Sequence, residues 1–323
     1  MENSKIKSFI KTNMMWLILV LIMVVFAILS PNFRSFRNIM NILNQNAYFI
    51  VATIGVAMIM ISGGTDLSVG QIIAVIGVGI ALAMEKGLPV PLACILGIVI
   101  GIVFGGFNGL AANVLKIHPM IVTLATMTMF KGISFILSGS KSFYNFSPAY
   151  LKIGQGSIGP VNIPVIIAIV VALVIHFILS KTCFGRFIYA VGGNPETARL
   201  AGIKVGRIKL MTFGLAGILF GISSIILTSR GGSASSNIGP GVEFDAITAC
   251  VLGGVSFIGG AGRVADAVVG CLILGVLTNG MQMIGLDVNS QYVVKGIILM
   301  ASIGYDTFQQ QAKVHKAAKK TKA

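Results

Sequence analysis

The chain is dominated by apolar runs that are too long for a fold with a water-facing surface. Met14–Ser30 and Leu88–Phe107 contain no charged residue, and only 10% of the 323 residues are charged. A soluble domain carries roughly 25% charged residues. In a bilayer the backbone must satisfy its own hydrogen bonds as helices or as a closed barrel. Barrel strands alternate apolar and polar residues, and these runs do not, so the sequence predicts an all-α polytopic membrane protein.

Ten segments are candidate membrane spans, since a helix needs about 20 apolar residues to cross the hydrocarbon core. They lie near residues 14–30, 46–62, 67–84, 90–112, 119–138, 161–180, 209–229, 245–258, 264–284 and 291–305. The segment 245–258 is short and interrupted by glycine. We therefore expect about ten transmembrane helices, with one glycine-broken or re-entrant segment.

The positive charges predict the topology, because cytoplasmic loops are enriched in Lys and Arg. With the N-terminus inside, the inside segments hold Lys5, Lys7, Lys11, Lys116, Lys181, Arg186, Arg199, Lys204, Arg207, Lys209, Arg263 and five tail lysines, whereas the outside segments hold Arg34, Arg37, Lys86, Lys141, Lys152 and Arg230. Both termini are therefore expected in the cytoplasm. The expected divisions are a cytoplasmic segment 1–13, a transmembrane domain 14–305 with a cytoplasmic loop 181–209, and a basic cytoplasmic tail 306–323. The net charge of +15 fits this topology without a nucleic-acid partner.

A polar break interrupts the apolar sequence at Ser62–Gly70. Gly63 and Gly64 precede Asp66 and Ser68, which stand where the next apolar run begins. One interpretation is a turn in which Asp66 caps the following helix. The other is a helix break beside a gate or a solute path, as transporters use. The sequence favours capping, because capping is common.

The cytoplasmic loop contains a short predicted helix. Asn194 is a suitable N-cap, Pro195 suits the first turn, Glu196 faces the helix dipole and Gly202 can end the helix. Such a helix at the membrane face can transmit motion from a soluble partner.

Glycines and in-span polar residues complete the pattern. Gly97, Gly101, Gly105 and Gly109 recur every four residues, which predicts a face for close helix packing. Lys131, Asp266 and Lys295 lie within or near spans, where ionisable groups are functional candidates by default. Candidates for a polar translocation path or gate are Gly63, Gly64, Asp66, Ser68, Asn108, Thr123, Thr126, Lys131, Asn279 and Gln282.

The sequence lacks the motifs of an ATPase or a hydrolase. No GxxxxGK[ST] loop, HExxH or GxSxG motif occurs, and the four cysteines have no metal-ligand spacing. We therefore expect no catalytic residue, no metal and no cofactor in this chain.

Five ordered motifs resemble the permease subunits of bacterial ABC importers for monosaccharides, of the ribose, xylose and arabinose type, with the ribose permeases nearest in pattern. They are GGTDLSVG at 63–70, HPMIVTLATM at 118–127, GRFIYAVGGNPETARLAGIKVGRIK at 185–209, GVEFDAITACVLGGVSFIGGAGR at 241–263 and LGVLTNGMQMIG at 274–285. The family usually has arginine where Lys131 stands.

The resemblance implies a non-catalytic subunit of the bacterial inner membrane. It also implies a second permease subunit, identical or related, a cytoplasmic ABC ATPase, and an extracytoplasmic binding protein that delivers a small neutral solute such as ribose. The ATPase-coupling loop would comprise Gly185, Arg186, Gly193, Asn194, Pro195, Glu196, Ala198, Arg199 and Gly202. The alternatives are a stand-alone secondary transporter or channel for a small polar solute, and an intramembrane enzyme, for which no catalytic constellation is visible.

Overall fold

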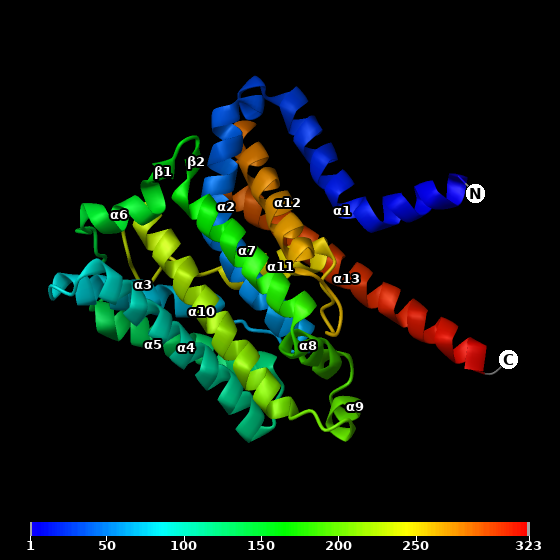
Figure 1. Cartoon of the computed structure of the whole chain (residues 1–323). Coiled ribbons are helices and arrows are strands. Elements are labelled where there is room, and N and C mark those ends of the chain that lie inside the picture. The colour runs from blue at the N-terminus through cyan, green and yellow to red at the C-terminus, as the bar shows by residue number, and fades with distance from the viewer. Residues whose placement is uncertain (1, 322–323) are drawn as a thin grey trace.

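The computed structural model describes the backbone of residues 2–321 and the side chains of residues 14–308. In chain order the elements are α1 (Glu2–Leu29), a 3-10 turn η1 (Pro31–Arg34), α2 (Phe36–Ile61), α3 (Val69–Glu85), α4 (Val90–Leu115), α5 (Pro119–Ser138), α6 (Pro148–Gln155), β1 (Ser157–Ile158), β2 (Val161–Asn162), α7 (Ile163–Lys181), α8 (Cys183–Gly193), α9 (Pro195–Leu200), α10 (Val205–Gly231), α11 (Val242–Gly253), α12 (Val264–Met283) and α13 (Val288–Thr321) (Figure 1). The predicted all-helical fold is confirmed, apart from one antiparallel hairpin in which Ser157 pairs with Asn162.

Six of the described helices are long and apolar enough to cross a membrane. They are α2, α4, α5, α7, α10 and α12, and shorter apolar helices occupy Met14–Leu29 and Val69–Glu85. The expected short segment is α11, which has 12 residues and so rises about 18 Å, against a hydrocarbon core of about 30 Å. A broken segment thus occurs where the sequence predicts it, and the count of about ten spans stays a prediction.

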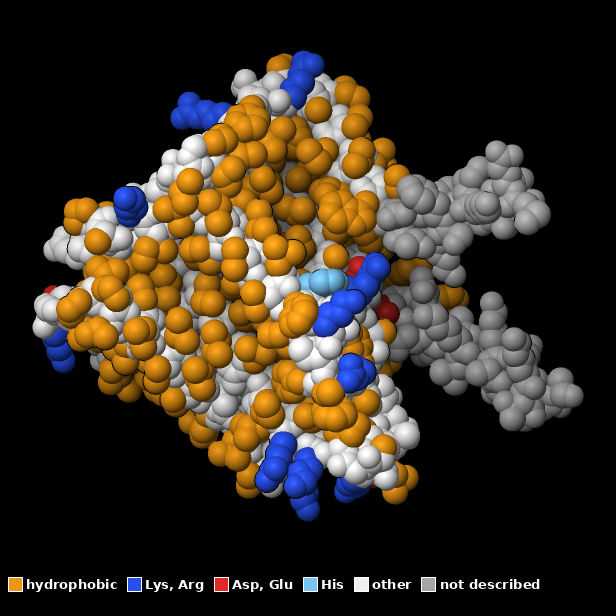
Figure 2. All heavy atoms as spheres, viewed as in Figure 1, with side chains coloured by type: hydrophobic (Ala, Val, Ile, Leu, Met, Phe, Trp, Pro, Cys, Tyr) orange, Lys and Arg blue, Asp and Glu red, His pale blue; other side chains and the backbone are white. Residues whose placement is uncertain are grey.

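The bundle has two ends, which the short elements mark. α6 and the β1–β2 hairpin lie at one end, and α8 and α9 lie at the other (Figure 1). Hydrophobic side chains cover most of the face seen in Figure 2, and the Lys and Arg side chains gather toward its edges. An apolar outer surface between two charged ends is the surface that a bilayer requires.

Two helices form the centre of the bundle. Every residue of α2 from Phe49 to Ile61 is buried, and so is every residue of α3 from Val69 to Val78. α2 packs against α7, α10, α11 and α12, whereas α3 packs against α4, α5 and α10. The helix break that joins α2 to α3 therefore lies inside the protein rather than against lipid.

The regularly spaced glycines of α4 form a close packing face, as predicted: Gly101, Gly105 and Gly109 lie against α10, and Gly97 lies against Ile76 and Ile80 of α3. A Cβ atom on Gly101 would lie 2.1 Å from the carbonyl oxygen of Gly217, and one on Gly105 would lie 2.5 Å from that of Phe213. Gly217 faces Gly101 in the same way, at 2.1 Å. The two backbones are in direct contact, so no larger side chain fits between them.

A methyl group added at Gly101 is expected to destabilise the bundle, whereas one added at Gly106 is not. Nothing lies within 4 Å of a Cβ atom at Gly106. Overpacking a core costs about 1–3 kcal/mol, while alanine in place of glycine favours a helix by about 1 kcal/mol. Thermal unfolding of the detergent-purified chain should give a lower Tm for Gly101→Ala and an unchanged or higher Tm for Gly106→Ala. Equal midpoints would contradict this packing.

Candidate gate and coupling site

The polar break between α2 and α3 is organised by Asp66, which is fully buried. Its Oδ1 atom accepts hydrogen bonds from the backbone N–H of Ser68, at 2.7 Å, and from the Ser68 hydroxyl, also at 2.7 Å. α3 begins at Val69, and its N-cap residue is Ser68. The predicted capping role of Asp66 therefore needs correction: Asp66 orders the turn before the helix and is not its N-cap, because the helix starts later than the motif suggests.

Asn108 and Thr123 connect this turn to α4 and α5. The Asn108 amide donates to the Ser68 hydroxyl at 2.8 Å and, more weakly, to Asp66 Oδ2 at 3.5 Å. The Thr123 hydroxyl accepts the backbone N–H of Leu67 at 3.1 Å and lies 3.2 Å from the carbonyl oxygen of Thr65. The structure thus brings together four residues that the sequence singles out separately: Asp66, Ser68, Asn108 and Thr123. We call these four residues the Asp66 network.

Glu243 is a buried carboxylate that sequence reasoning missed as a site residue. Only 1% of its surface is exposed, and its Oε1 atom accepts the N–H of Gly241 at 3.0 Å. A Cβ atom on Gly70 would lie 2.4 Å from Glu243 Oε2. Because Gly70 has no side chain, the Glu243 carboxylate fits beside the start of α3. The available signal was the acidic pair Glu243 and Asp245 at the start of the glycine-broken segment.

Three glycine-containing segments meet at the end of α2, and we call their meeting point the glycine junction. They are 61–64, 192–193 and 259–260. A Cβ atom on Gly192 would lie 1.8 Å from the carbonyl oxygen of Ile61, and one on Gly259 would lie 2.8 Å from the Cα atom of Gly63. The N–H of Gly260 donates to that same Ile61 oxygen at 2.9 Å.

The cytoplasmic helix predicted from the loop motif is α9. The Asn194 side chain accepts the N–H groups of Glu196 and Thr197, each at 3.0 Å, and Gly202 adopts a φ of +83° after the helix. Arg199 donates to the exposed Glu196 carboxylate. This hydrogen bond holds the pKa of Glu196 below its ordinary value, so the carboxylate is ionised at neutral pH. The predicted N-cap, first turn and end of the helix are confirmed.

α9 follows directly on α8, whose last two residues belong to the glycine junction. The Tyr189 hydroxyl of α8 also donates to the carbonyl oxygen of Gly262 at 2.7 Å. α9 is therefore connected, through α8, to both the α2–α3 break and the loop that follows α11. Gly185 is buried, with 2.3 Å between its potential Cβ atom and the carbonyl oxygen of Leu179, which fixes how α8 leaves α7.

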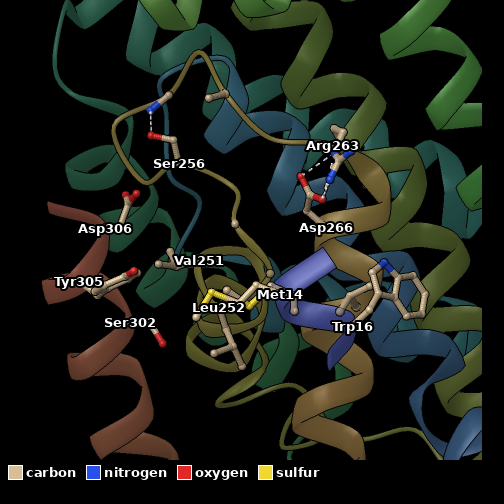
Figure 3. Close-up of a pocket in the computed structure, with 16 residues that line it drawn as sticks. Met14, Trp16, Val251, Leu252, Ser256, Arg263, Asp266, Ser302, Tyr305 and Asp306 are labelled. Carbon is tan, nitrogen blue, oxygen red and sulfur yellow. Dashed lines mark hydrogen bonds and ion pairs between the residues drawn. The ribbon is translucent and has the colours of Figure 1, made fainter. Parts of the chain in front are cut away.

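A large cavity borders the loop 254–263. Its volume is about 600 Å³, and its lining includes Trp16, Ser256, Arg263 and Asp306 (Figure 3). Asp306 Oδ2 of α13 accepts the N–H of Phe257 at 3.1 Å, and Arg263 pairs with Asp266 at 2.8 Å. The Arg263 pair is local, because its two residues lie three apart in the sequence. The loop is thus held by hydrogen bonds to Asp306 and Tyr189 and also borders open space.

The remaining candidates lie elsewhere. Thr126 is buried and donates to the backbone of Thr123 at 3.2 Å, so it adjoins the Asp66 network. Lys131 is exposed on α5 and Gln282 is exposed near the end of α12. Asn279 is paired with Asn38 of α2 through reciprocal amide hydrogen bonds of 2.9 and 3.1 Å. Arg186 is exposed, and Ala198 is buried on the inner face of α9.

Comparison with known proteins agrees with these features. Residues 38–303 match the family model described as branched-chain amino acid transport system / permease component. The chain is 38% identical to the ribose import permease protein of Bacillus subtilis, over 89% of this chain and 90% of that protein. It is 35% identical both to the D-allose transport system permease protein of Escherichia coli, over 90% and 89% of the two chains, and to the L-arabinose transport system permease protein of the same organism, over 89% and 88%. No solved structure gave a significant match. The resemblance to monosaccharide importer permeases is confirmed.

Removal of the Asp66 carboxylate is expected to destabilise the chain. Asp66→Ala would leave the Ser68 N–H without its buried acceptor, which costs about 1–3 kcal/mol. Asp66→Asn keeps an oxygen for Ser68 and should cost less. Thermal or chemical unfolding in detergent measures both, with the exposed Glu85→Ala as the control for loss of a carboxylate. A Tm for Asp66→Ala equal to that of Glu85→Ala would contradict the role of the network.

Proposed function

We propose that this chain, which belongs to the family of permease components of branched-chain amino acid transport systems, is the membrane-spanning subunit of an ATP-driven importer for a monosaccharide. The chain itself is a multi-pass, non-catalytic membrane subunit. Its relatives are import permeases for ribose, allose and arabinose, and this supports a small neutral sugar as the solute. D-ribose is the first candidate.

The chain needs partner proteins because it has no ATPase motif of its own. The sequence contains no P-loop, so the energy must come from a separate ATPase. We assign the docking surface to α9 and the adjoining residues of the loop 181–209, where Glu196 and Arg199 are exposed. A second permease subunit and an extracytoplasmic binding protein complete the assembly. This arrangement places both termini and α9 in the cytoplasm, as the distribution of Lys and Arg predicts.

The observation that carries the mechanism is the contact between α8 and the two interrupted segments at the glycine junction. When ATP closes the partner subunits, α9 moves and α8 moves with it. Because Gly192 contacts Ile61 and the Gly259–Gly260 loop directly, that motion reaches both breaks together. The Asp66 network then carries it to α4 and α5. In this mechanism Gly63, Gly64, Asp66 and Ser68 form a gate, and they need not bind the sugar.

Sugar uptake is expected to require both partners and ATP. The experiment reconstitutes the chain in liposomes with a candidate ATPase and binding protein, and offers radiolabelled D-ribose, D-allose, L-arabinose and D-galactose separately. Omission of the ATPase or of ATP should abolish uptake. Flux through the chain alone would contradict the proposal and would instead support a stand-alone transporter or channel.

Gly192→Ala is expected to uncouple ATP hydrolysis from uptake, whereas Gly214→Ala in α10 is not. The added methyl group at Gly192 would collide with the Ile61 carbonyl oxygen at 1.8 Å, while nothing lies within 4 Å of one at Gly214. In the same liposomes, Gly192→Ala should lower sugar transported per ATP by about tenfold, as about 1.4 kcal/mol in the coupled step implies. Glu196→Ala and Arg199→Ala, made together, should weaken ATPase docking. Equal coupling in the two glycine variants would refute the role of the junction.

A further inference from the structure

A second cavity lies away from the glycine junction, and we call it the polar cavity. It has a volume of about 190 Å³ and lies among α2, α10, α11, α12 and α13. Its wall includes Arg230 near the end of α10, whose backbone oxygen accepts from Gln155 of α6 at 3.2 Å. The cavity therefore lies toward the α6 end of the bundle, opposite α9.

We propose that the polar cavity is a binding site for one monosaccharide within the permease, occupied during transit. This inference rests on the proposed function, because it assigns that function's solute to a particular place. The residues that would contact the sugar are Asn46, Tyr48, Arg230, Asp245, Thr278 and Lys295.

The volume suits a single sugar ring. Drug-sized ligands occupy pockets of about 300–1,000 Å³. The polar cavity, at about 190 Å³, lies below that range, and a monosaccharide is likewise smaller than a drug-sized ligand. An oligosaccharide would not fit. The Asn38–Asn279 amide pair closes part of the wall, since Asn279 is buried there and its amide is already bonded to α2.

The wall offers both donors and acceptors, which a sugar needs because each hydroxyl donates and accepts. Lys295 is paired with Asp245 at 2.7 Å, so the carboxylate is held in place and retains further acceptor capacity. The buried Nε–H of Arg230 has no hydrogen-bond partner within the described residues. Lys295 neutralises Asp245, which leaves Arg230 as the net charge of the wall, so an inorganic anion is the competitor that the test must include.

Two further features give the wall a fixed shape. The Asn46 amide donates to the carbonyl oxygen of Ile42 at 2.7 Å, which fixes its orientation. A Cβ atom on Gly275 would lie 2.3 Å from that amide nitrogen. The Asn46 side chain therefore packs at this position against a glycine. Tyr48 adds an aromatic surface with a polar tip, a combination suited to a ring that is apolar on its faces and polar at its edge.

The test combines binding to the purified permease with transport by the full complex. Saturation-transfer NMR on the permease in nanodiscs would use D-ribose, D-allose, L-arabinose and D-galactose as probes, with inorganic phosphate in competition. We expect a signal from at least one of the sugars. Asn46→Ala and Thr278→Val should each weaken it about fivefold, as loss of one neutral hydrogen bond implies. Asn41→Ala, on an exposed part of the same helix, should leave it unchanged.

The outcomes separate the two proposals. If the wild-type complex imports a sugar and both cavity variants import and bind as the wild type does, the binding site is refuted while the function stands. If the wild-type permease binds a sugar through this cavity but the complex imports none, the function is refuted and the site stands. Displacement of the sugar by phosphate would overturn the assignment to a neutral solute. Binding-protein-stimulated ATP hydrolysis confirms that each variant is folded.

Discussion

The structure depends on the rule that a backbone polar group within a membrane must find its partner inside the protein. Two helices of this chain stop inside the bundle, at Ile61 and at Gly253, and each stop leaves carbonyl and N–H groups without helical partners. The loop after α11 supplies a partner to the end of α2, since the Gly260 N–H donates to the Ile61 oxygen. Glycine makes this possible because only a backbone without side chains approaches another so closely.

Glycine also leaves room for buried polar groups. Asp66 and Glu243 are both buried beside the start of α3, and Gly70 makes room for Glu243. The Asp66 network ties the first break to α4 and α5, while Tyr189 and the junction tie both breaks to α8. The polar cavity lies at the other end of the same helices. In the proposed mechanism, motion that starts at α9 therefore reaches the solute through α2, which is common to both regions.

Features that repeat locally could be predicted from the sequence. The four-residue spacing of the α4 glycines predicted their packing face, and Asn194 with Pro195 predicted the start of α9. Contacts between distant segments could not be predicted, because one sequence gives no information on which helices are neighbours. The Asn38–Asn279 pair spans 241 residues, and the Lys295–Asp245 pair joins α13 to α11. Asp66 illustrates the intermediate case: its hydrogen-bonding capacity was evident, but the helix start was set by tertiary packing and lies at Val69.

The burial of α3 from Val69 to Val78 has a consequence for biosynthesis. α3 carries Gln71 and begins beside Asp66, and it is surrounded by α4, α5 and α10. All three of these helices follow it along the chain, and α10 follows by far the latest. Until α4, α5 and α10 have been synthesised, the polar start of α3 has no protein around it. Exposure of these polar groups to hydrocarbon is energetically costly. The nascent segment must therefore wait, beside α2 or within the insertion machinery, until its later neighbours arrive.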